Sequence, residues 1–429
     1  MIYPNTILRL LIVCLAACLL SCGDDDPVIS DEPQIENPID SVLVSIKVQG
    51  DNLAEGIRGF VFLSDVTGSL IASSEYSNGD SVVLYSSQFE GSEFYLSQGL
   101  LYNNGEELEI ITYAKVNKGR KWVLYKVYTS EESEYPYRAD LKFQNAKEGA
   151  SYRVSAHDQS ISYFGVNVEN GYNTDLKTNP SDIYIVESND QDQFVKYGVF
   201  TEITEGDNLV DLRLVNNDIV SKTLAIPESL NVATIGIRAY PNSFNSGFYV
   251  CFRDQFTEEG FNISYPKEGF SDYYTQVYYE NDKFEYGQRT YGEDGIYIGT
   301  MNYDYDLMYD GEVITYSVSG DLDFMIFDIE KENVYHTWLV PFGEGKVVSL
   351  ELPQVLTNFD ASLNQPGYIN FRNILDIHTY SEWLDFISKS DNNLMDIFEL
   401  GLDFQELSIK EENSGGKLNN RRGKLPIIL

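Results

Sequence analysis

Tyrosine is the residue type that gathers most clearly in this sequence, and its chemistry suits a binding surface. Eleven of the 32 tyrosines fall between Tyr273 and Tyr316. A tyrosine ring can stack on the apolar face of a sugar while its hydroxyl forms a hydrogen bond. We therefore expect a ligand-binding surface formed by three pairs of residues: Tyr273 and Tyr274, Tyr278 and Tyr279, Tyr303 and Tyr305. The alternative is that most of these rings pack as cross-strand pairs.

Other groups that carry chemistry are sparse. Three histidines are scattered along the chain: His157, His336 and His378. None has metal-ligand spacing, and neither a G-x-S-x-G motif nor a phosphate-binding loop occurs, so we expect no metal, no cofactor and no catalytic residues. A Ser-His-Asp triad assembled from distant positions stays open. Asp304 and Asp306 alternate on one predicted strand face, which suits calcium, but Tyr309 stands where a calcium loop needs glycine. A solvated strand face is the preferred interpretation.

Cys22 is the cysteine with the most informative surroundings. Residues 10–20 before it are almost wholly apolar and uncharged, and Arg9 precedes them. Eleven helical residues rise only about 16 Å, roughly half of a bilayer core, so the run fits a signal peptide rather than a membrane span. If Cys22 is modified and the signal is removed, Cys251 alone remains, in a predicted strand, and no intramolecular disulfide forms. We expect Cys251 to be buried and inert.

Leu19-Leu20-Ser21-Cys22 resembles the lipobox of bacterial lipoproteins. The resemblance implies that residues 1–21 are removed and that acylated Cys22 holds the protein on a lipid bilayer. Asp24, Asp25 and Asp26 resemble the acidic export signal of surface lipoproteins of the Bacteroidota, which implies an outer-membrane, cell-surface location. The alternative is an ordinary secretory signal that happens to contain a cysteine.

Residues 22–40 are predicted to form an extended stalk. From Gly23 to Asp40 there are seven acidic residues, no basic residue and three prolines, and such a segment cannot bury apolar area. The net charge of the whole chain is −37, which argues against nucleic acid and anionic lipid as partners. Ser41 and Ser81, each between aspartate and valine, match the O-glycosylation acceptor pattern of the same bacterial group. The match makes both candidate acceptors, and Ser41, beside the stalk, is the better one because Ser81 falls in a predicted strand.

The remaining sequence predicts an all-β fold of tandem antiparallel β-sandwich domains with a small helical segment near the C-terminus. Short runs of β-branched and aromatic residues alternate with turn residues. The turn Asn117-Lys118-Gly119-Arg120 predicts a hairpin between strands at 108–116 and 122–128. Thr379-Tyr380-Ser381-Glu382 predicts a helix start. The predicted domains are a first sandwich at 41–147, a second β region at 148–352 that a turn near 228 would divide, a mixed segment at 353–412 and a flexible basic tail at 413–429.

Residues 57–85 resemble a transthyretin-like β-sandwich. The resemblance lies in Ile57–Phe62, Asp65 with Thr67-Gly68, Leu70–Ala72 and Asn78-Gly79. This pattern occurs in carboxypeptidase-regulatory modules and in fimbrillin-type pilus lipoproteins. The second likeness implies assembly into a fibre, but residues 22–40 lack the arginine at which protease-activated fimbrillins are cut.

The function that we expect from the sequence is non-catalytic binding of a glycan or a partner protein at the cell surface. A lipidated cysteine, an acidic stalk and tandem β-sandwiches are similar in plan to glycan-binding lipoproteins of the starch-utilisation type. The expected partners are the lipid bilayer, through acylated Cys22, and a polysaccharide or surface protein, but no nucleic acid. The alternatives are a structural or accessory subunit of a surface fibre and a glycan-acting enzyme.

Overall fold

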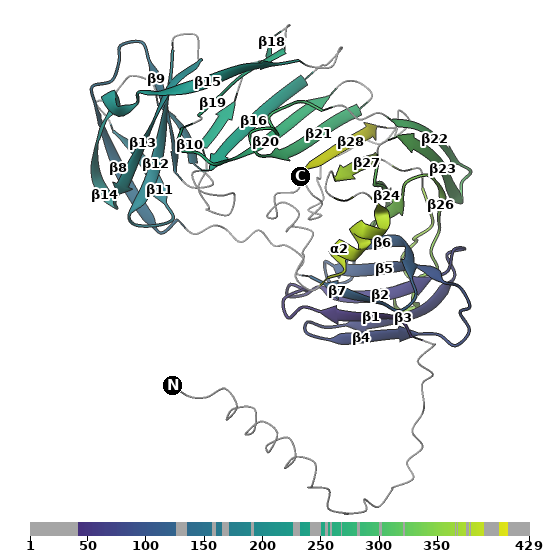
Figure 1. Ribbon diagram of the computed structural model, residues 1–429. Coiled ribbons are helices and arrows are strands. Elements are labelled where there is room, and N and C mark those ends of the chain that lie inside the picture. Colours follow the sequence, from purple (N-terminus) through teal and green to yellow (C-terminus); the bar gives the residue numbers. More distant parts are fainter. Residues whose placement is uncertain are drawn as a thin grey trace, which may run out of the picture. The chain divides into compact units, whose positions relative to one another are not determined.

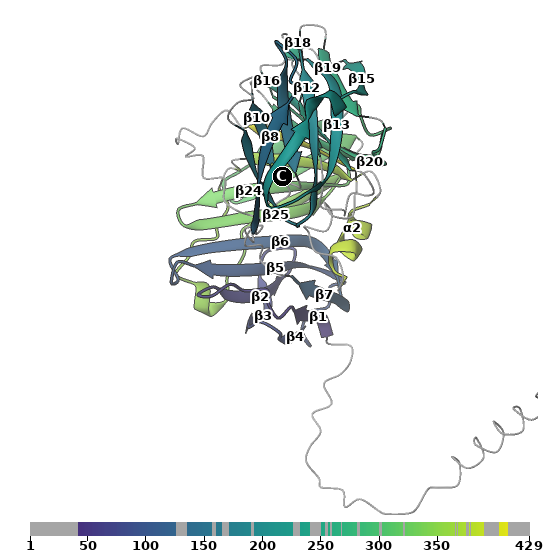
Figure 2. The same ribbon diagram turned by 90° about the vertical axis from the view of Figure 1, so that its left-hand side faces the viewer.

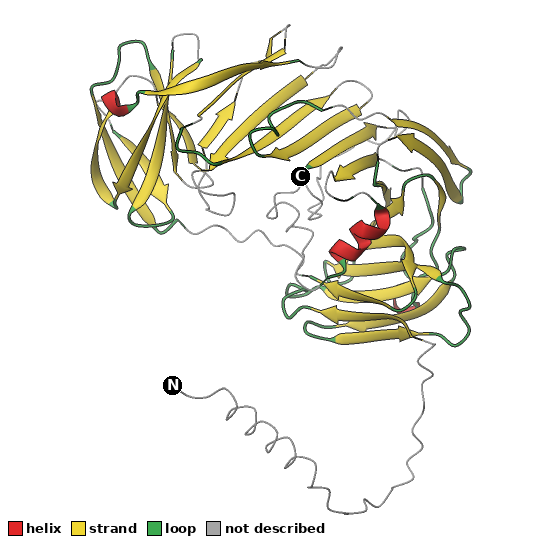
Figure 3. Ribbon diagram, in the orientation of Figure 1, coloured by secondary structure: helices red, strands yellow, loops and turns green. Residues whose placement is uncertain are grey.

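Strands dominate the computed structural model, as the sequence predicted (Figure 1). It describes residues 42–410 apart from these gaps: 126–134, 157–159, 165–170, 190–192, 226–231, 241–249, 254–255, 258–259, 267, 281–283, 300–302, 321, 365, 367, 375–376, 378 and 390–402. Within the described residues the one α-helix is α2, near the C-terminal end (Figure 3). The predicted all-β fold with a small C-terminal helical segment is therefore confirmed.

The largest sheet has twelve strands drawn from both ends of the described chain. Their order is β17 (Val250–Arg253), β16 (Val232–Tyr240), β20 (Asp272–Glu280), β21 (Phe284–Tyr291), β28 (Phe404–Lys410), β27 (Tyr368–Ile374), β24 (Phe324–Lys331), β25 (Val334–Pro341), β6 (Glu107–Asn117), β5 (Glu93–Tyr102), β2 (Arg58–Ser64) and β3 (Leu70–Tyr76). Neighbours are antiparallel except β25 and β6, which are parallel. That single pairing joins the N-terminal strands to the C-terminal ones.

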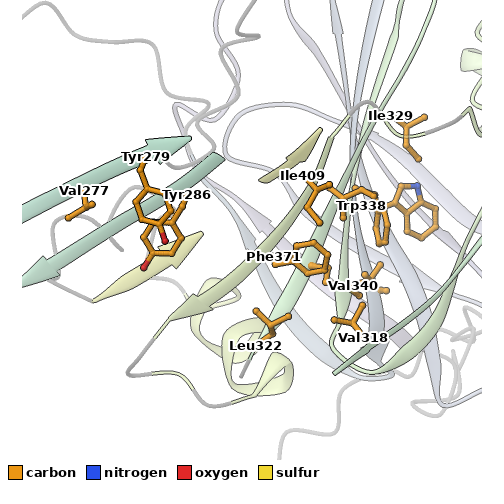
Figure 4. Packing of buried hydrophobic residues seen from close by; sticks show 14 of the residues in the cluster. Val277, Tyr279, Tyr286, Val318, Leu322, Ile329, Trp338, Val340, Phe371 and Ile409 are labelled. Carbon is orange, nitrogen blue, oxygen red and sulfur yellow. The ribbon is translucent and has the colours of Figure 1, made fainter. Parts of the chain in front are cut away.

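The main hydrophobic core lies on one face of this sheet. A three-stranded sheet packs against that face, in the order β22 (Tyr303–Tyr309), β23 (Val313–Gly320) and β26 (Glu344–Val348). Ile314, Val318 and Val347 are buried in the same cluster as Trp338 and Phe371 of the large sheet (Figure 4). Alternating residues of each strand supply this core because successive side chains point to opposite faces.

A second core lies on the opposite face, over β2, β5 and β6. It is covered by a sheet in the order β4 (Ser81–Tyr85), β1 (Val42–Val48) and β7 (Arg120–Leu124), and by α2 (Tyr380–Ile387). Trp383 of the helix is fully buried and stacks on Phe324 with a ring separation of 4.4 Å. Its ring also lies 6.1 Å from that of Tyr113 in β6, and Figures 1 and 2 show α2 beside β6. The first sandwich is thus completed by residues from the far end of the sequence.

A third core lies between two sheets built from the middle of the chain. One sheet has the order β11 (Tyr172–Leu176), β8 (Tyr137–Gln144) and β14 (Gly206–Asp211), and the short helix η3 (Leu212–Leu214) follows β14. The other has the order β10 (Ser160–Phe164), β9 (Ser151–Ala156), β12 (Ser181–Ser188), β13 (Phe194–Ile203), β15 (Asn217–Leu224), β19 (Gly260–Pro266) and β18 (Phe256–Thr257). Leu141, Val154 and Ile185 are buried between them. Because β8 belongs here, the sheets change between β7 and β8 rather than at the predicted boundary of 147.

The hairpin predicted around Gly119 is wrong. Strand β6 pairs with β5 and β25, whereas β7 pairs in parallel with β1 in the other sheet. The turn therefore carries the chain from one sheet to the other. Gly119 does adopt a turn conformation, with φ of +82°, but turn chemistry does not choose the sheet that the next strand joins. In the sheet that it joins, β7 buries Trp122 in the second core.

The start of α2 follows the predicted pattern. Thr379 caps the helix, because its hydroxyl oxygen accepts a hydrogen bond of 3.2 Å from the backbone N–H of Glu382. The buried positions then recur at helical spacing: Tyr380, Trp383, Leu384 and Ile387.

Candidate functional site

The predicted tyrosines do not form one exposed cluster, because strand alternation divides them between two faces. Tyr273 and Tyr279 of β20 point into the main core and are only 4% and 3% exposed. Tyr279 stacks on Tyr286 of β21 with a ring separation of 4.4 Å (Figure 4). The hydroxyl of Tyr273 donates to the backbone oxygen of Pro266 at 2.7 Å. The expectation that these two rings bind a ligand is wrong, since they are core residues.

The other predicted tyrosines also lie apart. Tyr274 and Tyr278 point to the opposite face of β20, where Tyr274 is buried and Tyr278 is half-buried. Tyr305 belongs to β22 in another sheet and is 42% exposed, with its ring 5.6 Å from that of Phe371. Tyr303 begins the same strand, and its side chain lies outside the described part of the structure. Tyr274 and Tyr278 therefore share one surface of the large sheet.

That surface is the face of β16, β20 and β21 that lies opposite the main core, and we call it the tyrosine–glycine face. The register of the three strands places Gly236, Gln276 and Arg289 in one row across the sheet. The next row on one side contains Tyr278 and Gly287, and the next row on the other side contains Arg238, Tyr274 and Tyr291.

Two glycines of this face, Gly236 and Gly287, have open space above them in the described part of the structure. No atom of the described residues lies within 4 Å of a Cβ built on Gly236 or on Gly287. Neither glycine has the positive φ that would require this residue. Glycine weakens a strand interior and often marks a place where a ligand approaches the backbone closely. Gln276 stands beside them and is exposed.

Aromatic rings border the glycines on one side. Tyr274, Tyr240 and Tyr291 form a small cluster, in which the rings of Tyr274 and Tyr291 are 5.2 Å apart. The guanidinium of Arg238 lies 5.2 Å from the centre of the Tyr274 ring. Burial raises the pKa of Tyr274, against the opposing effect of Arg289 and Arg238, and raises that of Tyr291 well above its usual range. Burial thus favours the neutral form of both hydroxyls.

Tyr278 borders the glycines on the other side. Its hydroxyl donates a hydrogen bond of 2.6 Å to Oε2 of Glu280, two residues further along the same strand face. This contact fixes the ring and holds a carboxylate beside it. A half-buried ring, an exposed amide and a carboxylate are the groups with which proteins hold a sugar ring and its hydroxyls.

Sequence reasoning missed most of this face. Gly236, Gly287, Gln276, Arg238 and Tyr291 were not singled out, although two glycines inside strand patterns were a usable signal. The separation of Tyr274 and Tyr278 from Tyr273 and Tyr279 also follows from the twofold period of a strand.

Several other predicted residues lie outside the described part of the chain. These are the lipidation residue Cys22, the acidic residues Asp24, Asp25 and Asp26, and the modification site Ser41. Ser81 is the first residue of β4 and is exposed. Cys251 lies in β17, as predicted for its backbone.

Among the described residues there is neither a metal-binding cluster nor a membrane-spanning helix. No three histidine, cysteine, aspartate or glutamate side chains in this part of the chain are placed to hold a metal ion. Asp304 and Asp306 are exposed on β22. None of the helices described between residues 42 and 410 is long and apolar enough to cross a membrane.

A scan against protein-family models found no family that matches this chain, and a search of curated proteins found no similar sequence.

Proposed function

We propose that this protein is a non-catalytic, surface-anchored lipoprotein that binds a glycan on its tyrosine–glycine face. The observation that carries the proposal is the bare strand surface over Gly236 and Gly287, bordered by Tyr278 and by the cluster around Tyr274. A sugar ring placed there would contact the backbone of two strands. Its hydroxyls would meet the Gln276 amide and the Glu280 carboxylate, and Tyr278 would contact its apolar face.

The anchoring part of the proposal is supported by sequence alone. Leu19-Leu20-Ser21-Cys22 and the three following aspartates are the supporting residues. Attachment at Cys22 would place the body at the cell surface, where polymeric sugars are available as ligands.

Valine substitution at Gly287 tests the site sharply. Valine favours strands, and an added Cβ meets no described atom within 4 Å, so we expect Gly287→Val to fold as stably as the parent protein. Its side chain would fill the space in which the sugar lies, and binding should be lost. Tyr278→Ala should weaken binding about tenfold, which corresponds to about 1.4 kcal/mol. Both effects are measured by retention on a panel of immobilised polysaccharides and by calorimetry with the polysaccharide that is retained.

Tyr305→Ala is the matched control, because it removes an exposed tyrosine from a different sheet. It should leave retention unchanged. Equal binding by the parent, Gly287→Val and Tyr278→Ala proteins would show that this face is not the site. A subunit of a fibre would instead run as a ladder of high-mass species on a sizing column.

A further inference from the structure

The sheet formed by β4, β1 and β7 has an unusual charge for this protein. The chain contains 67 acidic and 30 basic residues. Nevertheless, these three strands contain no aspartate or glutamate, and they carry Lys47, Arg120 and Lys121.

Strand register shows which of their side chains point away from the protein. Ser45 is paired with both Val83 and Lys121, and Lys47 lies opposite Ser81. The alternate residues, such as Ile46 and Trp122, are buried in the second core. Lys47 and Lys121 are exposed, Val83 is 48% exposed and Tyr85 is 56% exposed. The outward side therefore presents two lysines, an aromatic ring and an aliphatic side chain, and we call it the basic face.

The lysines of the basic face keep their charge available. Neither Lys47 nor Lys121 has a carboxylate partner among the described residues, whereas Arg120 is paired with Asp385 at 2.7 Å. By contrast, the strands of the sheet β22–β23–β26 carry exposed Asp304, Asp306 and Glu344. The sheet β22–β23–β26 therefore does not share the charge of the basic face.

The position of β1 in the sequence indicates which surface the basic face contacts. Strand β1 begins at Val42, directly after the predicted stalk of residues 22–40, and Val42 pairs with Tyr85. At about 3.1 Å per residue, such a stalk keeps the start of β1 within roughly 50–60 Å of an acyl group on Cys22. We propose that the basic face rests against an anionic lipid surface and thereby orients the tethered body. This inference depends on the lipid anchor of the proposed function.

Two lysines are enough for this role because the anchor supplies proximity. Each is attracted to an anionic surface, and the attraction decays within about 8 Å at physiological salt. Free in solution, a protein of net charge −37 would not stay on such a surface. Once the protein is tethered, its effective concentration at the lipid surface is of about millimolar order, so weak contacts are enough to orient it. The acidic remainder of the body is repelled by the same surface, which reinforces the orientation.

A tryptophan at position 85 would report the contact. The three native tryptophans, Trp122, Trp338 and Trp383, are all buried, so they are shielded from a quencher in the lipid. The experiment places acylated full-length Tyr85→Trp protein on vesicles of phosphatidylcholine containing brominated lipid, with or without phosphatidylglycerol. We expect added quenching on the anionic vesicles only. Lys47→Glu with Lys121→Glu should reduce that added quenching by about half or more, because it replaces attraction to the anionic lipid with repulsion.

Lys177→Glu with Lys346→Glu is the matched control, because it makes the same charge change at two exposed lysines outside the basic face. It should leave the quenching as it is. Equal quenching on neutral and anionic vesicles, or no loss in the Lys47 and Lys121 variant, would overturn the proposed contact while the anchor stands. Failure of the acylated protein to sediment with either vesicle would instead refute the anchor, and this inference with it. Retention on polysaccharide, measured without vesicles, reports the glycan proposal separately.

Discussion

Gly68 and Gly79 show how the surroundings of a residue, more than its own conformation, decide its importance. Both have positive φ, at +89° and +83°. A Cβ on Gly68 would lie 2.0 Å from the backbone oxygen of Ser349, whereas a Cβ on Gly79 would meet no described atom within 4 Å. The oxygen of Gly68 also accepts a hydrogen bond of 2.9 Å from the backbone N–H of Glu351.

We therefore predict that Gly68→Ala is much more destabilising than Gly79→Ala. Each substitution forces alanine into a left-handed conformation, at a cost of about 1–3 kcal/mol. Gly68→Ala must in addition push the backbone at Ser349 away, so its free energy of unfolding should fall further, by about 2 kcal/mol or more. Urea denaturation of the two variants measures the difference. Equal losses would mean that the contact between the turn and residues 349–351 contributes little.

His336 gives the molecule a dependence on pH. It is buried, and its Nε2 lies 2.8 Å from the hydroxyl of Thr112, which in turn lies 2.9 Å from that of Ser97. Burial lowers its pKa to about 3. The unfolded chain takes up this proton near pH 6.5, so between pH 6.5 and 3 the unfolded state binds a proton that the folded state does not. Stability falls as the pH falls through that window.

We predict that His336→Asn makes the protein less sensitive to acid, even if it lowers stability at neutral pH. The parent should lose about 1.6 kcal/mol more than the variant between pH 6.5 and pH 5, because the slope rises toward about 1.36 kcal/mol per pH unit as the unfolded state becomes fully protonated. Chemical denaturation at the two pH values gives the comparison.

Glu109→Gln is an informative control of opposite sign: burial raises the Glu109 pKa to about 7, so the parent residue favours the folded state more as the pH falls. Parallel pH profiles for parent and His336→Asn would contradict the assignment.

At the scale of single elements, the N-cap of α2 should contribute to the stability of the second core. Thr379→Ala removes the acceptor for the Glu382 backbone N–H and should cost about 1 kcal/mol. Thr379→Ser keeps the hydroxyl and should restore nearly all of that stability. Thermal unfolding of the three proteins measures both effects. If serine and alanine behave alike, the cap does not hold the helix on the core around Trp383.

The sequence predicts single helices and strands better than it predicts which strands pair with one another. The cap at Thr379 and the strand at Val42–Val48 follow from local patterns, because capping and alternation act over a few residues. Even there, a bulge between Val42 and Val44 in β1 places Val42 opposite exposed Tyr85, away from the core that buries Val44. The pairing of β6 with β25 joins residues more than two hundred positions apart, and no local pattern encodes it. The tyrosine–glycine face combines residues of β16, β20 and β21. The sequence therefore predicted only its tyrosines and not the residues that the neighbouring strands place beside them.

At the scale of the whole molecule, the acidic run after Cys22 should govern location without affecting the fold. Asp24, Asp25 and Asp26 lie outside the described residues 42–410, so replacing them with alanine should not change the urea midpoint of unfolding. The amount of protein removed by protease shaving of intact cells should fall, while total membrane-bound protein stays constant. Alanine at Asp304 and Asp306 of β22 is the control for removal of exposed acidic charge. Unchanged shaving of the aspartate variant would remove the support for an export signal.

The parallel contact of β6 with β25 sets the order in which this protein can mature. A ribosome delivers β1 to β7 first, yet β6 has no neighbour on one side until residues 334–341 emerge, and the first sandwich lacks Trp383 until α2 is made. The earliest-synthesised part is therefore among the last to be finished. Contacts so distant in sequence make folding slow, and the waiting edge of β6 can pair with other chains in the meantime. Premature termination after residue 333 would leave that edge permanently open to pairing with other chains.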